Sequence, residues 1–97
     1  MKVENGILKG ELKVKGGKLI KCTLELDEEK IKRIKITGDF FMYPEDAIEK
    51  LEKSLQGIQF DEEEISKKVK EALKDVELIG VAMEDFVDVI LDSKINQ

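Results

Sequence analysis

Apolar and polar residues alternate along the first third of the chain, which is the pattern of β-strands with one face toward water. One alternating run covers about residues 7–15, and a second covers residues 20–27. Gly16 and Gly17 lie between them and tolerate the positive φ angles of a tight hairpin turn. A polar turn over residues 27–30 leads to a third run around residues 34–37. The pattern predicts a three-stranded antiparallel meander.

After Gly38 the spacing of apolar residues changes from two to about 3.6, the period of a helix. A first helix is predicted through Ile48 and Leu55, with Pro44 in its first turn. Gly57 is expected to stop this helix in a left-handed conformation.

A second helix is predicted over about residues 62–73, where Asp61 and Glu64 have the spacing of a capping box. Phe60 and Ile65 fit the hydrophobic staple around that box. The carboxylates of this segment therefore need no cation site to explain them.

The rest of the chain predicts a short extended piece at residues 78–81 and a third helix from Met83 or Glu84 to about Leu91. The tail from Ser93 is expected to fray. Strands followed by helices describe an α+β fold, in which about three helices pack on one face of the meander. The same order is similar to the fold of sulfur-assembly scaffold proteins.

The length of 97 residues is enough for one core and too short for two, so residues 1–97 are expected to form one domain. The chain is 41% hydrophobic and 40% charged, which predicts a soluble protein. Its apolar runs are much shorter than the roughly 20 residues of a membrane span, and it starts without a signal-peptide pattern. We therefore expect a cytoplasmic protein without a membrane partner.

The chain has one cysteine, Cys22, and no histidine. A lone cysteine cannot form an internal disulfide or supply a metal site, and the commonest general base is missing. This composition argues against self-contained catalysis by a thiol, a triad or zinc. Cys22 lies on the apolar face of the second strand and is expected to be a small buried hydrophobe.

Charge is divided unevenly along the chain, although the formal net charge is −5. Residues 1–37 carry ten basic and six acidic side chains, whereas residues 38–97 carry seven and sixteen. A basic platform of this kind attracts nucleic acid, an acidic protein or a phosphate-bearing ligand, and charge alone does not choose among them.

Two segments combine residue types that suit a site. At the hairpin, Gly16, Gly17 and Lys18 offer backbone N–H groups and an ammonium to a phosphate or carboxylate. An ordinary hairpin with lysines for solubility explains the same residues.

The second segment, at the end of the third strand, concentrates aromatic residues. Phe40 and Phe41 are adjacent and point opposite ways in extended chain, so one of them is expected to face a partner. Asp39 fits the cap of the following turn better than it fits binding of a basic group across an interface.

The order of these segments resembles the C-terminal accessory domain of lipoate–protein ligases. The likeness covers residues 13–57, with Lys-Gly-Gly-Lys-Leu-Ile, then Ile-Lys-Ile-Thr-Gly-Asp-Phe-Phe, then a Pro-Glu-Asp helix that ends in Leu-Gln-Gly. The later Gly-Val-Ala-Met-Glu-Asp-Phe is similar to the closing segment of that domain. In this family the domain is either fused behind a large catalytic domain or encoded as a separate small subunit, notably in archaea, and the chain resembles the separate form.

The resemblance implies a non-catalytic subunit that the large catalytic subunit needs to form lipoyl-adenylate from lipoate and ATP, before lipoyl transfer to acceptor-protein lysines. ATP, Mg and lipoate are then used by the complex, and no cofactor is expected on this chain alone. Gly16, Gly17 and Lys18 become candidates for lying near the adenylate, and the candidates for the partner interface are Gly38, Asp39, Phe40 and Phe41.

Three other functions fit parts of the pattern. An iron–sulfur scaffold shares the fold order but needs three cysteine ligands, and only Cys22 is present. A nucleic-acid module would use the basic strands, but the aromatic cluster lies outside them and the net charge is negative. An interaction subunit of a related biotin-type ligase is the third.

Overall fold

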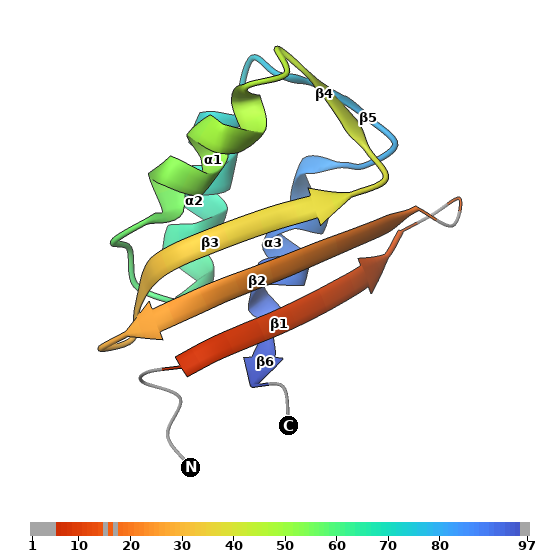
Figure 1. Ribbon diagram of the computed structural model, residues 1–97. Helices are drawn as coiled ribbons and strands as arrows, with labels where there is room; N and C mark the ends of the chain where they lie inside the picture. Colours follow the sequence, from red (N-terminus) through yellow and green to blue (C-terminus); the bar gives the residue numbers. More distant parts are fainter. Residues whose placement is uncertain (1–5, 15, 17, 96–97) are drawn as a thin grey trace.

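The alternating runs of the first third form an antiparallel sheet, and the later segments form helices that cover one of its faces (Figure 1). The computed structural model describes residues 6–14, 16 and 18–95. Its strands are β1 (Gly6–Lys13), β2 (Leu19–Asp27), β3 (Lys30–Gly38), β4 (Phe41–Tyr43), β5 (Glu77–Ile79) and β6 (Lys94–Ile95). Its helices are α1 (Ala47–Leu55), α2 (Glu62–Ala72) and α3 (Met83–Leu91). The α+β prediction, a meander followed by three helices, is confirmed.

The strand order in the main sheet is β3-β2-β1-β6. The hairpin between β1 and β2 closes where Val14 N donates to Lys18 O at 2.8 Å, so β1 ends at Lys13, two residues before the predicted end of the first strand. Gly16 has a φ of +90°, as the turn prediction requires, while Gly17 lies outside the described residues. The predicted reversal of the chain is confirmed.

The turn between β2 and β3 is tighter than the sequence suggests. Glu28 and Glu29 have φ angles of 53° and 68°, and Asp27 pairs directly with Lys30. Two residues with positive φ are the geometry that matches the twist of a hairpin. β3 therefore begins at Lys30, four residues before the alternating run that predicted it.

The outer edge of β3 is covered by helix α1 and by the loop after it. Ile36 N donates to Glu52 Oε2 at 2.8 Å, and Ile31 N donates to Ile58 O at 2.9 Å. These bonds satisfy backbone groups that an exposed edge strand would leave open to other chains.

The helix ends follow the predicted signals with one correction. Gly57 follows α1 with a φ of +87°, and Asp61 caps α2 by accepting from Glu64 N at 3.2 Å. The prediction that Pro44 lies in the first turn of α1 is wrong, because the helix begins at Ala47 and Ala47 N donates to Pro44 O.

The prediction that the tail frays from Ser93 is also wrong. The Ser93 side chain is 5% exposed, and its Oγ donates to Val89 O at 3.0 Å. Strand β6 follows at once and pairs antiparallel with β1. The meander thus gains a short fourth strand.

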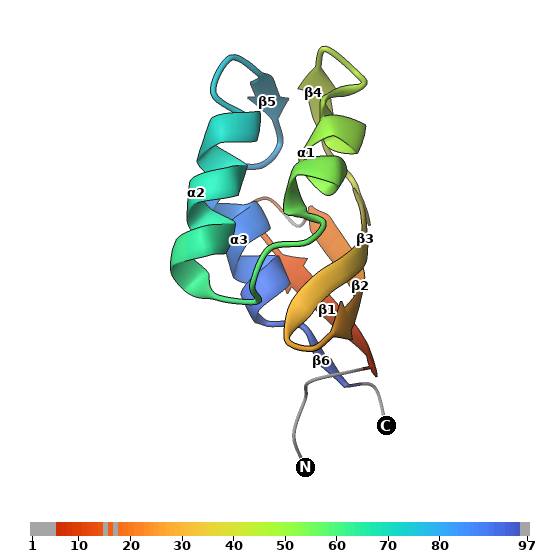
Figure 2. The ribbon, with the colours of Figure 1, turned by 90° about the vertical axis from the view of Figure 1, so that its left-hand side faces the viewer.

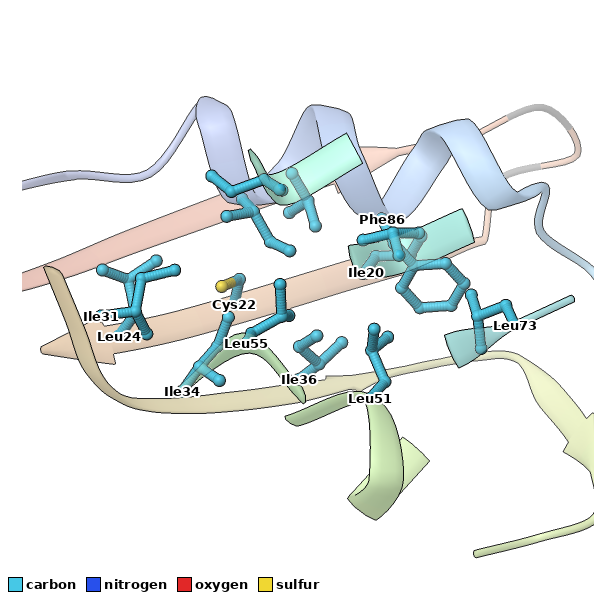
Figure 3. Close-up of a cluster of buried hydrophobic side chains, with 14 of the residues drawn as sticks. Ile20, Cys22, Leu24, Ile31, Ile34, Ile36, Leu51, Leu55, Leu73 and Phe86 are labelled. Carbon is cyan, nitrogen blue, oxygen red and sulfur yellow. The ribbon is translucent and has the colours of Figure 1, made fainter. Parts of the chain in front are cut away.

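The core lies between the sheet and the helices, and Figure 3 shows its apolar side chains meeting from both layers. Ile20 and Leu24 of β2 are buried together with Leu51, Leu55 and Phe86 of the helices. Figure 2 shows that the helices cover one face of β1–β3 and leave the other open. Within the described residues, no helix is long and apolar enough to cross a membrane.

Candidate functional site

The β1–β2 hairpin, the end of β3 and the β4–β5 pair meet at one end of the molecule (Figure 1). Gly38 fits the junction because a Cβ there would collide with the Leu19 carbonyl oxygen and lie 3.0 Å from Ile20 Cα. Asp39 N donates to the same Leu19 oxygen at 2.9 Å. The structure thus gives Gly38 a packing role, and its contact with a partner stays a prediction.

Lys18 lies next to this junction, and Gly80 lies between them. Gly80 has a φ of +90°, and a Cβ placed on it would lie 3.6 Å from the Asp39 carbonyl oxygen and 3.9 Å from Lys18 Cγ. The stem of Lys18 therefore lies beside Gly80, and its ammonium group belongs to an exposed residue. The fold brings Lys18, Gly38, Asp39 and Phe40 together.

Phe40 and Phe41 point in opposite directions, as predicted. The Phe40 ring packs edge-on against Phe86 of α3, with 5.2 Å between ring centroids and an interplanar angle of 87°. Phe41 is 64% exposed. Phe40 therefore anchors the junction to the core, and Phe41 is available to a partner.

Phe41 belongs to an exposed apolar surface on the two-stranded sheet of β4 and β5, which we call the ribbon. Phe41 pairs directly with Ile79 in the register, and Tyr43 pairs with Glu77. Ile79 is 44% exposed and Tyr43 is 47% exposed, whereas Met42, on the other side of the ribbon, is buried. Three large apolar side chains thus face solvent on one side of a short ribbon, the kind of patch that marks a binding surface.

An open groove runs beside the ribbon toward α1. It is lined by Ile36, Thr37, Gly38, Phe40, Phe41, Met42, Glu45 and Ile48. The groove includes Gly38, Phe40 and Phe41 from the predicted interface, so these three share one concave surface.

The Asp39 side chain does not cap the following turn. It is exposed and, among the described residues, it forms no hydrogen bond or ion pair. The predicted capping is therefore not observed. Its carboxylate remains open to solvent beside the groove.

Cys22 is a structural residue, as predicted. Its side chain is 1% exposed in the core (Figure 3). Burial raises the pKa of the Cys22 thiol to about 11, with a smaller contribution in the same direction from the Glu52 charge, while a hydrogen bond with Ser93 acts against this rise. A thiol that stays protonated is a poor nucleophile and a poor metal ligand. In the part of the chain that the structure describes, no group of three or more His, Cys, Asp or Glu side chains is placed to hold a metal ion.

Sequence reasoning missed Ile79 and Gly80 as parts of this surface. Ile79 was placed only in a short extended piece, and nothing local indicates that this piece pairs with residues 41–43. Tyr43 was visible within the aromatic cluster, but its exposure follows from the same pairing. This surface is formed by a strand pairing between distant segments, and the periodicity of the sequence does not reveal such a pairing.

Comparison with known proteins agrees with this fold. The family model of the bacterial lipoate protein ligase C-terminus matches residues 8–90. Lipoate-protein ligase A subunit 2 of Thermoplasma acidophilum is 41% identical over 77 residues, which cover 74% of this chain and 76% of that protein.

A solved structure gives the same result at the level of the fold. A chain from the archaeal lipoylation system of Thermoplasma acidophilum, a bipartite lipoate protein ligase and its E2 lipoyl domain, superimposes with a TM-score of 0.80. The match covers 89% of this chain and 96% of that chain at 38% identity. Because the family model matches most of the chain and both relatives agree, this chain belongs to the family of the C-terminal domain of lipoate–protein ligases.

Proposed function

We propose that this chain is the accessory subunit of a bipartite lipoate–protein ligase. In this proposal the large catalytic subunit requires it for the ATP-dependent activation of lipoate to lipoyl-adenylate, before lipoyl is transferred to lysines of acceptor proteins. The observation that carries the proposal is the agreement in sequence and fold, over 89% of the chain, with a chain from a bipartite ligase.

The chemistry of the chain supports a role without catalysis of its own. It has no histidine, and its one thiol is buried with a raised pKa. In this proposal ATP, magnesium and lipoate are used by the complex, and no cofactor is bound by this chain alone. This subunit is proposed to supply no nucleophile and no proton transfer, and its one contribution near the adenylate is the positive charge of Lys18.

The ribbon supplies the surface on which the large subunit would dock. Phe41, Tyr43 and Ile79 are exposed in this chain alone, and a partner that covers them removes apolar area from water. Each such side chain contributes about 1.5–3 kcal/mol when it is fully buried. The groove beside the ribbon offers a place for a side chain of the partner.

Docking at the ribbon would bring Lys18 close to the catalytic site. Lipoate carboxylate and ATP phosphates repel each other, and an ammonium group that approaches both offsets the repulsion while water is excluded. Lys18 stands beside Gly80, one residue after Ile79 of the ribbon, so a subunit seated on the ribbon meets it.

The first test is lipoate-dependent ATP–pyrophosphate exchange by the large subunit, measured with and without this chain. We expect exchange only when both are present. Full exchange by the large subunit alone would contradict the proposal and leave the chain as a binding module.

The proposed role of Lys18 at the hairpin is tested by the variant Lys18→Ala. We expect the exchange rate of the complex to fall by about tenfold, because one favourable charge near the developing anhydride is lost. Lys67→Ala, on the exposed side of α2, is the matched control and is expected to keep the wild-type rate. Equal rates for both variants would remove Lys18 from the mechanism while leaving the accessory role intact.

A further inference from the structure

The open face of the main sheet is basic, although the whole chain is acidic. Helices cover the other face (Figure 2), so alternate side chains of β1, β2 and β3 point to solvent. The exposed basic side chains at these positions are Lys9, Lys13, Lys21, Arg33 and Lys35. Glu11, Glu25 and Asp27 are the acidic residues among them, so five basic side chains stand against three acidic ones. We call this surface the basic face.

Charge on the basic face is only partly neutralised from within the molecule. Glu25 is already paired, with Arg33 Nε at 3.5 Å and Lys32 Nζ at 3.9 Å. Lys9 and Lys35 lie in one row across the sheet, on either side of Thr23, and are not in ion pairs with other described residues. Neighbouring strands are about 4.8 Å apart, so the Cα atoms of Lys9 and Lys35 are about 10 Å from each other, with Thr23 and no acidic residue between them in the row.

The helices on the opposite side carry a net negative charge, which comes mainly from α3, because α1 and α2 contain both lysines and glutamates. Helix α3 presents Glu84 and Asp88 to solvent, and the first turn of α2 adds Glu62 and Glu63. A negatively charged partner is repelled from α3 and attracted to the sheet, so the charge distribution favours its approach to the basic face. The complementary partner is an acidic one.

The composition of the basic face favours a transient protein partner. Ile7 is the one large hydrophobic side chain on it that is strongly exposed among the described residues. An interface without an apolar centre is governed by electrostatic attraction and exchanges readily. The described strands also place no aromatic side chain on this face, whereas single-stranded nucleic acid is bound by stacking on such rings.

We propose that the basic face docks the acceptor protein of the ligase through an acidic surface around the acceptor's target lysine. This inference rests on the proposed function, because lipoyl transfer needs one macromolecule that binds and leaves in every cycle. The ribbon and the basic face then serve different partners. The large subunit binds stably to the apolar ribbon, and the acceptor binds transiently to the basic face.

The test is a triple charge reversal, Lys9→Glu, Lys21→Glu and Lys35→Glu, in the reconstituted complex with the cognate lipoyl-acceptor domain as probe. We expect kcat/KM for the acceptor to fall by about tenfold or more at low salt through an increase in KM, because complementary charges mainly govern encounter. The difference from wild type should shrink as NaCl is raised toward 0.5 M, where charges are screened within a few ångströms. ATP–pyrophosphate exchange, which involves no acceptor, should keep its wild-type rate.

The matched control is Lys53→Glu, Lys67→Glu and Lys74→Glu, which makes the same change in net charge with exposed lysines on or beside α1 and α2. Its acceptor KM should stay near the wild-type value. An unchanged KM in the sheet variant, or an equal rise in both variants, would overturn the proposal. The proposal would also be overturned if single-stranded RNA bound the wild-type complex tightly at 0.15 M salt and competed with the acceptor. Failure of the exchange assay itself would instead remove the proposed function.

Discussion

At the scale of single residues, the junction depends on backbone atoms that approach closely. Gly38 lies against the backbone of Leu19 and Ile20, and these atoms cannot move without disturbing the β2–β3 pairing. A contact with backbone is less forgiving than one with the end of a flexible side chain. The glycine is therefore required by packing, whatever a partner adds.

We predict that Gly38→Ala lowers the free energy of unfolding by about 1–3 kcal/mol, the usual effect of overpacking. Urea denaturation followed by circular dichroism measures it. Thr37→Ala is the control, because Thr37 precedes Gly38 and its side chain is exposed. This substitution should change the free energy of unfolding by less than about 0.5 kcal/mol. Equal stability of the two variants would mean that the junction relaxes around the added methyl group.

Cys22 makes stability depend on pH in the alkaline range. In the unfolded chain its thiol titrates near 9.0, while burial holds the pKa of the folded form at about 11. Above pH 9 the unfolded thiol loses its proton and the folded one keeps it, so the unfolded state becomes favoured. The contribution of the protonated Cys22 thiol to the free energy of unfolding is fully present below pH 9. It is lost as the pH rises toward 11.

We therefore predict that the stability difference between wild type and Cys22→Ala shrinks by about 2–3 kcal/mol from pH 8 to pH 11, at 1.36 kcal/mol for each pKa unit. Urea denaturation at both pH values gives the two differences. The comparison with the variant cancels the contributions of the other groups, which both proteins share. Parallel pH profiles would show that the thiol is not buried in solution.

At the scale of elements, the ribbon combines a buried side with an exposed apolar side. Met42 and the half-buried Leu78 hold it to the core, and Phe41 and Ile79 face outward from the same pair of strands. Because adjacent strand residues point to opposite sides, the outer side chains are removable without opening the core.

We predict that Ile79→Ala weakens binding of the large subunit by about tenfold, as expected when one anchor of an interface is truncated. Isothermal titration calorimetry with the large subunit measures this change. Ile7→Ala is the matched control, because Ile7 is 56% exposed and lies on the main sheet instead of the ribbon. An equal loss of affinity in both variants, or none in Ile79→Ala, would place the interface elsewhere.

At the scale of the whole molecule, the two layers separate the surfaces by chemistry. The β4–β5 pair stands at one end, and the helices cover one side of the main sheet and leave the other side open (Figures 1 and 2). The exposed apolar residues lie on the ribbon, and the basic face lies on the open side of the sheet. A partner that binds the folded state alone stabilises the fold by mass action. Subunit association should therefore be visible in the stability of this chain.

We predict that the large subunit, at about 100 times its dissociation constant, slows the globally protected amides of β2 by about a hundredfold in hydrogen exchange. Mass spectrometry of peptides from residues 19–27 measures the slowing. The Ile79→Ala variant at the same concentrations should show a smaller effect. Exchange that is insensitive to the large subunit would contradict a stable complex.

The local elements could be predicted from the residue pattern alone. Alternation predicted the meander, the Asp61 cap predicted the start of α2, and the opposed directions of Phe40 and Phe41 followed from strand geometry. These features depend on residues within a few positions of each other, where periodicity and capping are decisive. The resemblance to the ligase family rested on the same local segments.

Which distant segments meet depends on the folded core. The pairing of residues 41–43 with 77–79, the approach of Gly80 to Lys18 and the pairing of β6 with β1 join parts of the chain that lie far apart in sequence. The burial of Ser93 and the late start of α1 after Pro44 follow from the same packing. Such contacts form because each segment is stabilised more by burial and strand pairing with one particular neighbour than by exposure to water. Which neighbour is available depends on the assembled core, and no local pattern of residues reveals it.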